Sequence, residues 1–135
     1  MNDTFIPRSD YTTKKWYIFD AKQKPVGRVA TIISKILQGK HKIDYHPAIN
    51  MGDYIIIVNA KDMIFDASIV KYHVYSPGRP GRSLKRIINC TSQRIIESAV
   101  KNMLPKGLRS QIPNRLRIYE STEHPHIAQN PIILQ

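Results

Sequence analysis

Apolar residues recur at intervals of three or four positions in two stretches of the chain. The first stretch covers residues 25–38, with Pro25 at its start and Gly39 directly after its end, and its apolar positions are Val26, Val29, Ala30, Ile33, Ile36 and Leu37. Proline is favoured in a first helical turn and glycine just past a last one. The second stretch covers residues 92–103 and is followed by Pro105. Both patterns predict a helix with one apolar face.

Two other stretches are short and almost continuously apolar, at residues 16–19 and 54–59. Such runs are typical of strands that are buried on both faces of a parallel sheet covered by helices. The order strand, helix, strand therefore predicts a βαβ unit and an α/β fold class. Weaker patterns predict a third strand at residues 63–65 and a fourth at residues 72–75.

The rest of the chain shows little periodicity. Residues 1–14 contain Pro7 and several polar positions, and we interpret them as an extended N-terminal arm. Residues 76–83 form a loop that contains two prolines and two glycines. A length of 135 residues fits one domain, so residues 15–135 are expected to form a single domain.

The charge of the chain changes this picture most. Twenty-one Lys and Arg face ten Asp and Glu, which gives a formal net charge of +11 and a pI near 10.0. Residues 1–69 carry ten basic and seven acidic side chains (net +3), whereas residues 70–135 carry eleven and three (net +8). A domain this basic has polyanions as its natural partners. Nucleic acid is the first candidate partner. The surface that contacts it is expected within residues 71–117.

Catalytic and metal-binding alternatives find little support in the motifs. The turn after the first strand has one glycine, where a dinucleotide fingerprint needs three. If the chain were an enzyme acting on nucleic acid or a nucleotide, Asp20, Asp53 and His41 would be the best candidate catalytic residues. For Asp20, however, stabilisation of a turn is the favoured interpretation. The sequence has one cysteine, Cys90, and His124 and His126 lack metal-site spacing. We expect no enzyme, no metal and no cofactor.

Two further alternatives concern membranes. The longest aliphatic run is far too short to span a bilayer. A membrane-surface protein is disfavoured because no basic amphipathic helix with a large aromatic face is present. The first ten residues resemble neither a signal peptide nor a transit peptide, so the protein is expected to work where it is made.

Lysines, arginines and three histidines are the candidate RNA contacts, because arginine binds phosphate oxygens bidentately and folded RNA is recognised largely through phosphates and 2′-hydroxyls. These candidates are Arg28, Lys40, His41, Lys42, Arg79, Arg82, Lys85, Arg86, Arg94, Lys101, Lys106, Arg109, Arg115, Arg117, His124 and His126.

Several strings resemble, in the same order, those of the family of large-subunit ribosomal protein thirteen, in its bacterial and plastid form. One of them is Gly39-Lys40-His41-Lys42, and the strings together occupy residues 16–21, 27–31, 39–42, 52–54, 58–60, 99–106 and 123–131. The chain departs from the family pattern at residues 72–77 and 80–85, and residues 85–94 form a shorter segment than is usual there.

The resemblance implies a three-layer α/β/α fold with a four-stranded parallel sheet, basic loops and a C-terminal tail. It also implies a structural role in the large ribosomal subunit, with large-subunit rRNA and neighbouring ribosomal proteins as partners. Early subunit assembly and support of translation belong to the same expectation. The N-terminal residues and the richness in Ile, Asn and Lys favour a plastid ribosome over a bacterial one.

Overall fold

The computed structural model describes residue 6, residues 13–65 and residues 92–134. In chain order, the elements are β1 (Trp16–Asp20), α1 (Val26–Gln38), β2 (Tyr54–Val58), η2 (Ala60–Asp62), α4 (Ser92–Met103), η3 (Lys106–Gln111), α5 (Ile112–Arg115), β3 (Leu116–Ile118), η4 (Ile127–Gln129) and β4 (Ile132–Leu134), where η marks a 3₁₀ helix. Most of the predicted N-terminal arm lies outside the described residues, as does the loop at residues 76–83.

In the described part of the chain, four strands form one parallel sheet in the order β3-β2-β1-β4. In the register of β1 and β2, Ile18 lies opposite Ile56. The α/β class and the four-stranded parallel sheet implied by the family resemblance are therefore confirmed.

The two helices predicted from apolar spacing are also confirmed. Pro25 is the N-cap of α1, and Gly39 ends this helix in the left-handed conformation, with φ of 79°. Helix α4 spans the predicted residues 92–103 and buries Ile96 and Val100 completely. It packs beside α1, so that both apolar faces contribute to the same core.

Two of the four predicted strands have a different outcome. The strand expected at residues 63–65 is wrong, because Ile64 forms only an isolated bridge with Pro25. The strand expected at residues 72–75 lies outside the described residues. The outer strands are instead β3 and β4, three residues each, which are too short to leave a recognisable alternation in the sequence.

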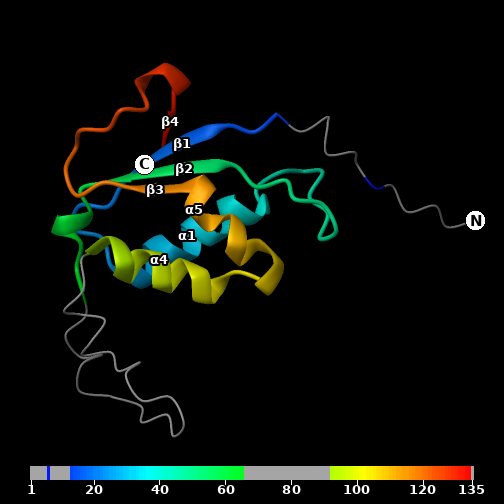
Figure 1. The fold of residues 1–135 in the computed structure, drawn as a ribbon, viewed down its shortest axis with the longest axis horizontal. Helices are drawn as coiled ribbons and strands as arrows, with labels where there is room; N and C mark the ends of the chain where they lie inside the picture. The colour runs from blue at the N-terminus through cyan, green and yellow to red at the C-terminus, as the bar shows by residue number, and fades with distance from the viewer. Residues whose placement is uncertain (1–5, 7–12, 66–91, 135) are drawn as a thin grey trace, which may run out of the picture.

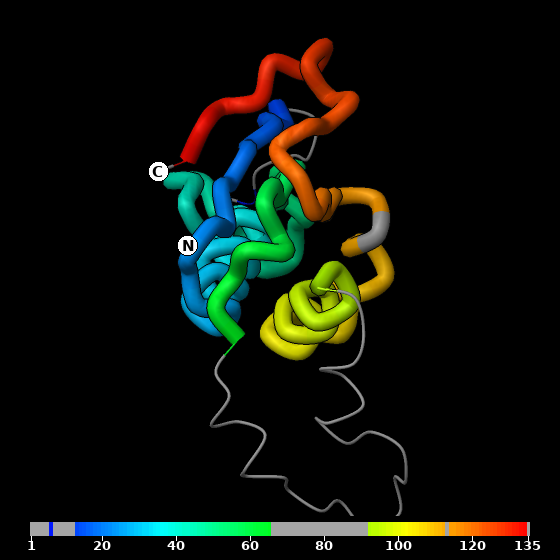
Figure 2. The backbone as a smooth tube through the Cα atoms, turned by 90° about the vertical axis from the view of Figure 1, so that its left-hand side faces the viewer, coloured from blue at the N-terminus to red at the C-terminus, as the bar shows by residue number. Residues whose placement is uncertain are grey.

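The sheet is covered on both faces. Helices α1, α4 and α5 lie on one face (Figure 1), and the main core forms there around Phe19, Ile55 and Ile57. Successive side chains of a strand point to opposite faces, so Ile56 points away from this core, yet it is fully buried. Segment 119–131, which contains η4, crosses the sheet on that second face (Figures 1 and 2). The three layers are thus helices, sheet and this C-terminal segment.

Candidate nucleic-acid interface

The loop that leads from α1 into β2 is built around a buried carboxylate. Asp53 has no solvent exposure, and its Oδ1 accepts hydrogen bonds from the Lys42 Nζ at 2.7 Å and from the Lys15 backbone N–H at 3.0 Å. Its Oδ2 lies 2.9 Å from the His41 Nε2, at ion-pair distance but without a hydrogen bond. The Lys42 Nζ also donates to the Met51 carbonyl at 3.0 Å. The charge of Lys42 is therefore directed into the protein.

Two glycines allow this loop to fold back onto the end of α1. A Cβ on Gly52 would lie 1.8 Å from the carbonyl oxygen of Leu37, and a Cβ on Gly39 would lie 2.7 Å from the carbonyl oxygen of Met51. Gly39 also has the positive φ that side chains rarely adopt. Only glycine fits at either place, and the close approach carries Lys42 to its buried partner.

Arg115 braces the same loop from the other side. Its guanidinium donates to the side-chain oxygen of Asn50 and to the carbonyl of Gly52, the latter at 3.3 Å. Asn50 in turn donates to the side chain of Gln111. Burial lowers the pKa of Arg115 from its usual value, although the nearby Tyr54 and Asp53 raise it. Arg115 thus has an internal structural role.

Other predicted contacts stand in solvent. The exposed cations are Arg28 on α1, Lys40 after it, Arg94 and Lys101 on α4, Lys106 in η3 and Arg117 on β3. Arg109 is half-buried, and its Nε donates to the carbonyl of Leu104 at 2.9 Å. None of these side chains forms an ion pair within the described part of the chain. Arg79, Arg82, Lys85 and Arg86 lie outside the described residues.

His124 and His126 belong to an aromatic cluster on the second face of the sheet. Trp16 stacks on Tyr54 with ring centroids 4.5 Å apart and on His126 at 5.5 Å. The His126 Nε2 lies 2.8 Å from the hydroxyl of Tyr119, and the backbone N–H of His126 donates to the His124 Nδ1 at 3.3 Å. Both histidines are half-buried and hold the C-terminal segment against β1 and β2.

The residues considered for catalysis have structural roles. Asp20 accepts hydrogen bonds from the Lys22 backbone N–H at 3.0 Å and from the Asn59 side chain at 2.9 Å, and these bonds lower its pKa. The turn-stabilising interpretation of Asp20 is thus confirmed. Asp53 is enclosed in the cluster with Lys42 and His41. Within residues 13–65 and 92–134, no group of three or more metal-ligating side chains is found.

Membrane insertion finds no support in the helices. Of those that the structure describes, none is long and apolar enough to cross a bilayer.

The sequence interpretation missed the exposed isoleucines of the C-terminal segment, Ile127, Ile132 and Ile133. The sequence does mark this segment as different from the rest of the basic chain, because residues 118–135 contain Glu120 and Glu123 but no Lys or Arg. It also missed that Lys42 and Arg115 are turned inward. No local signal marks either residue, since their partners lie elsewhere in the chain.

Comparisons with known proteins show which family the chain is similar to. A profile of the family described as Ribosomal protein L13 matches residues 14–125. The chain is 49% identical over 135 residues to the large ribosomal subunit protein uL13c of Trieres chinensis, covering 99% of this chain and 97% of that protein. It is 44% identical over 135 residues to uL13 of Blochmanniella pennsylvanica (95% and 94% covered) and 38% identical over 141 residues to uL13 of Synechococcus elongatus (99% and 93%).

Proposed function

The chain belongs to the ribosomal protein L13 family, and we propose that it is a structural constituent of the large ribosomal subunit that binds large-subunit rRNA. Members of this family are structural components, so the chain is not an enzyme. The resemblance drawn from the ordered motifs is confirmed by the match.

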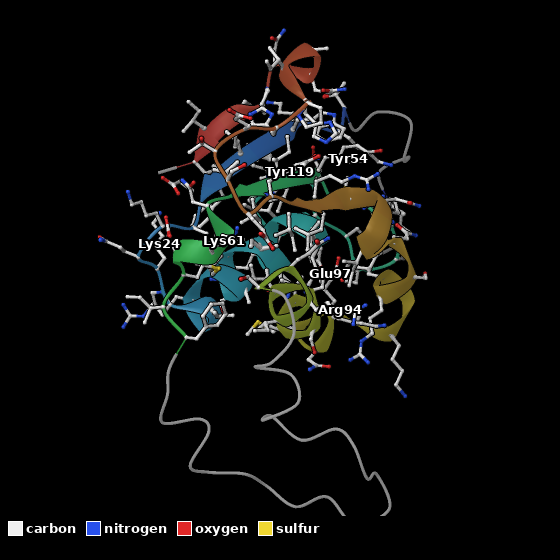
Figure 3. The ribbon with its side chains drawn as sticks, turned by 60° about the vertical axis from the view of Figure 1, so that its left-hand side comes forward. Lys24, Tyr54, Lys61, Arg94, Glu97 and Tyr119 are labelled. Carbon is white, nitrogen blue, oxygen red and sulfur yellow. The ribbon has the colours of Figure 1, made fainter. Side chains whose placement is uncertain are left out.

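The observation that carries the RNA proposal is the row of exposed cations on α4 and η3. Arg94 and Lys101 are seven residues apart, which places them on the same side of α4, about 10 Å apart along its axis. Lys106 follows at the start of η3. We call these three residues the α4–η3 ridge. Figure 3 shows Arg94 on α4, well away from Lys24 in the same view.

Such a ridge suits the backbone of a folded RNA. Phosphate contacts dominate the affinity of these interfaces, and each one releases counterions. The other exposed cations, Arg28, Lys40 and Arg117, extend the proposed contact surface to α1, its following loop and β3. The arginines and the lysine among residues 79–86 remain proposed contacts on sequence grounds alone.

Three of the predicted RNA contacts are bound partly or wholly within the protein. Lys42 and Arg115 use their charges within the protein, and we assign them the positioning of the loop at residues 39–53. His41 is one-third exposed and can face both Asp53 and a ligand.

The finer aspects of the function are proposals supported by the relatives. We assign the chain an early role in subunit assembly and a supporting role in translation, with other large-subunit proteins as neighbours. The identity of 49% to the plastid-type uL13c supports a plastid ribosome, although the bacterial relatives follow at 44% and 41%.

The RNA proposal is tested by the salt dependence of binding. The affinity of the isolated chain for a large-subunit rRNA transcript is measured at several salt concentrations. The logarithm of the association constant falls linearly with the logarithm of the salt concentration. The double variant Lys101→Gln/Lys106→Gln should make this slope shallower by about 1.5, because two phosphate contacts are lost.

The matched control is Lys22→Gln/Lys24→Gln, which removes the same charge from the turn after β1. Its slope should equal that of the unmodified chain. Equal losses in both variants would show that only net charge matters, and no loss in either would remove the α4–η3 ridge from the interface.

A further inference from the structure

The segment that follows Arg117 differs chemically from the rest of this basic protein. Residues 118–135 carry Glu120 and Glu123 and no Lys or Arg, although the whole chain has a net charge of +11. Glu120 is paired with Lys61 at 3.0 Å, whereas Glu123 has no ion-pair partner among the described residues. The two carboxylates would repel an RNA phosphate backbone, and the segment has no Lys or Arg to attract one.

The same segment exposes three isoleucine side chains. Ile127 and Ile133 are each 75% exposed, and Ile132 is 47% exposed. Ile127 and Ile133 line a shallow hollow of about 390 Å³ together with Ile18, His124, Asn130 and Pro131. Contiguous exposed apolar surface of this kind marks sites where another molecule binds.

Strand β4 adds a backbone feature to this surface. It is an edge strand of the sheet (Figure 1), and within the described residues it pairs only with β1. Ile132 and Ile133 point to opposite faces of the sheet because they are consecutive in a strand. Strands that are apolar on both faces are usually interior strands. Exposed edges are usually protected by shortness, Lys, Pro or a bulge; β4 is three residues long and follows Pro131, but it carries no charged residue.

We propose that the outer edge of β4 and the hollow beside it bind an extended segment of a neighbouring protein in the same ribosomal particle. The segment adds a fifth strand through main-chain hydrogen bonds and places apolar side chains over Ile127 and Ile133. This inference rests on the proposed function, because it takes its partner from within the large subunit. It also assigns His124 to a protein-binding surface.

The charges indicate the chemistry of the partner. Glu123 is exposed and directly precedes His124, which lines the hollow, so it favours Lys or Arg in the residues that flank the apolar part of the segment. A segment that reaches this site while lying against rRNA also needs positive charge. The same segment of a second copy of this chain fits less well, because it carries Glu120 and Glu123 and no Lys or Arg.

The proposal is tested by photocrosslinking in purified large subunits that contain the full-length chain. Two variants are compared, Ile133→p-benzoylphenylalanine and Lys101→p-benzoylphenylalanine, and the crosslinked products are sequenced. The first should crosslink to a peptide of another ribosomal protein, with apolar residues flanked by Lys or Arg. The second should crosslink to rRNA.

Each other result for the probe at position 133 overturns the proposal: a crosslink to rRNA, to a second copy of the chain or to an acidic peptide, or no crosslink at all. The probe at position 101 reports separately on the RNA proposal. If it fails to reach rRNA while position 133 reaches a protein, the RNA interface is wrong and the docking surface stands.

A polar substitution provides a second readout. Ile133→Asn should release the chain from salt-washed subunits roughly tenfold faster, since a buried isoleucine contributes on the order of one decade or more of affinity. Its affinity for the rRNA transcript alone should stay unchanged. The control Thr122→Asn alters an exposed position in the same segment and should affect neither. Equal release rates for the two variants would contradict the docking surface.

Discussion

Replacing Lys42 with methionine tests the separation of structural from RNA-binding cations. Methionine keeps most of the apolar stem but removes the charge that lies 2.7 Å from the Asp53 Oδ1. Asp53 has no exposure, so Lys42→Met leaves a buried carboxylate without its main partner. Breaking a buried pair in this way costs about 3–5 kcal/mol.

The expected cost lies at the lower end of that range, about 3 kcal/mol. His41 stays 2.9 Å from the Asp53 Oδ2, and the backbone N–H of Lys15 still donates to Oδ1. A domain of this kind has a total stability of about 5–15 kcal/mol, so the loss is large but need not prevent folding.

Urea unfolding measures this loss, and the fluorescence of Trp16 reports it, because Trp16 is the one tryptophan of the chain and stacks within the folded sheet. The matched control is Lys40→Met, the same replacement at an exposed neighbour, which should change stability by less than about 0.5 kcal/mol. The double variant Lys42→Met/Asp53→Asn should recover at least about 1 kcal/mol, since no unpaired charge remains. Equal stabilities for Lys42→Met and Lys40→Met would refute the reasoning.

Two further substitutions test the turns around this loop. Gly52→Ala should abolish soluble, folded protein, because its Cβ would lie 1.8 Å from the carbonyl oxygen of Leu37; circular dichroism checks this against Gly27→Ala, which has open space at its Cβ and should fold normally. Asp20→Ala should lower the free energy of unfolding by less than about 1 kcal/mol at neutral pH, because the carboxylate is exposed and accepts one backbone bond from Lys22. The pKa of Asp20 is lowered in the folded state, so its contribution is present above the usual value of 3.8 and is lost as the pH falls through the lowered pKa; urea unfolding across pH should show the difference between variant and unmodified chain vanish in acid.

Local patterns predicted the elements that are long or strongly apolar. Helices α1 and α4 were visible from the spacing of their isoleucines and valines, and β1 and β2 from continuous apolar runs. Strands β3 and β4 were not, because three residues carry too little periodicity and their assignment depends on pairing with β2 and β1. Residues 63–65 have a strand-like composition, but no strand position remains for them beside β1 and β2.

The candidate site could also be predicted only in part from the sequence. The sequence identified the basic part of the chain, since charge is a property of composition. It could not distinguish Lys40 from Lys42, because Lys42 is neutralised by Asp53 eleven residues away. Arg115 resembled Arg117 for the same reason, and only the contacts with Asn50 and Gly52 separate them. Burial of a charge is decided by tertiary contacts, which no local pattern records.

Sedimentation tests most directly whether this chain is a structural part of a large ribosomal subunit. Extract from cells or organelles that express the chain is fractionated on a sucrose gradient at moderate salt, and the chain is detected in each fraction. The chain should sediment with the large subunit and should stay bound when the subunits are washed with salt. A chain found only in the soluble fractions at the top of the gradient would contradict the account.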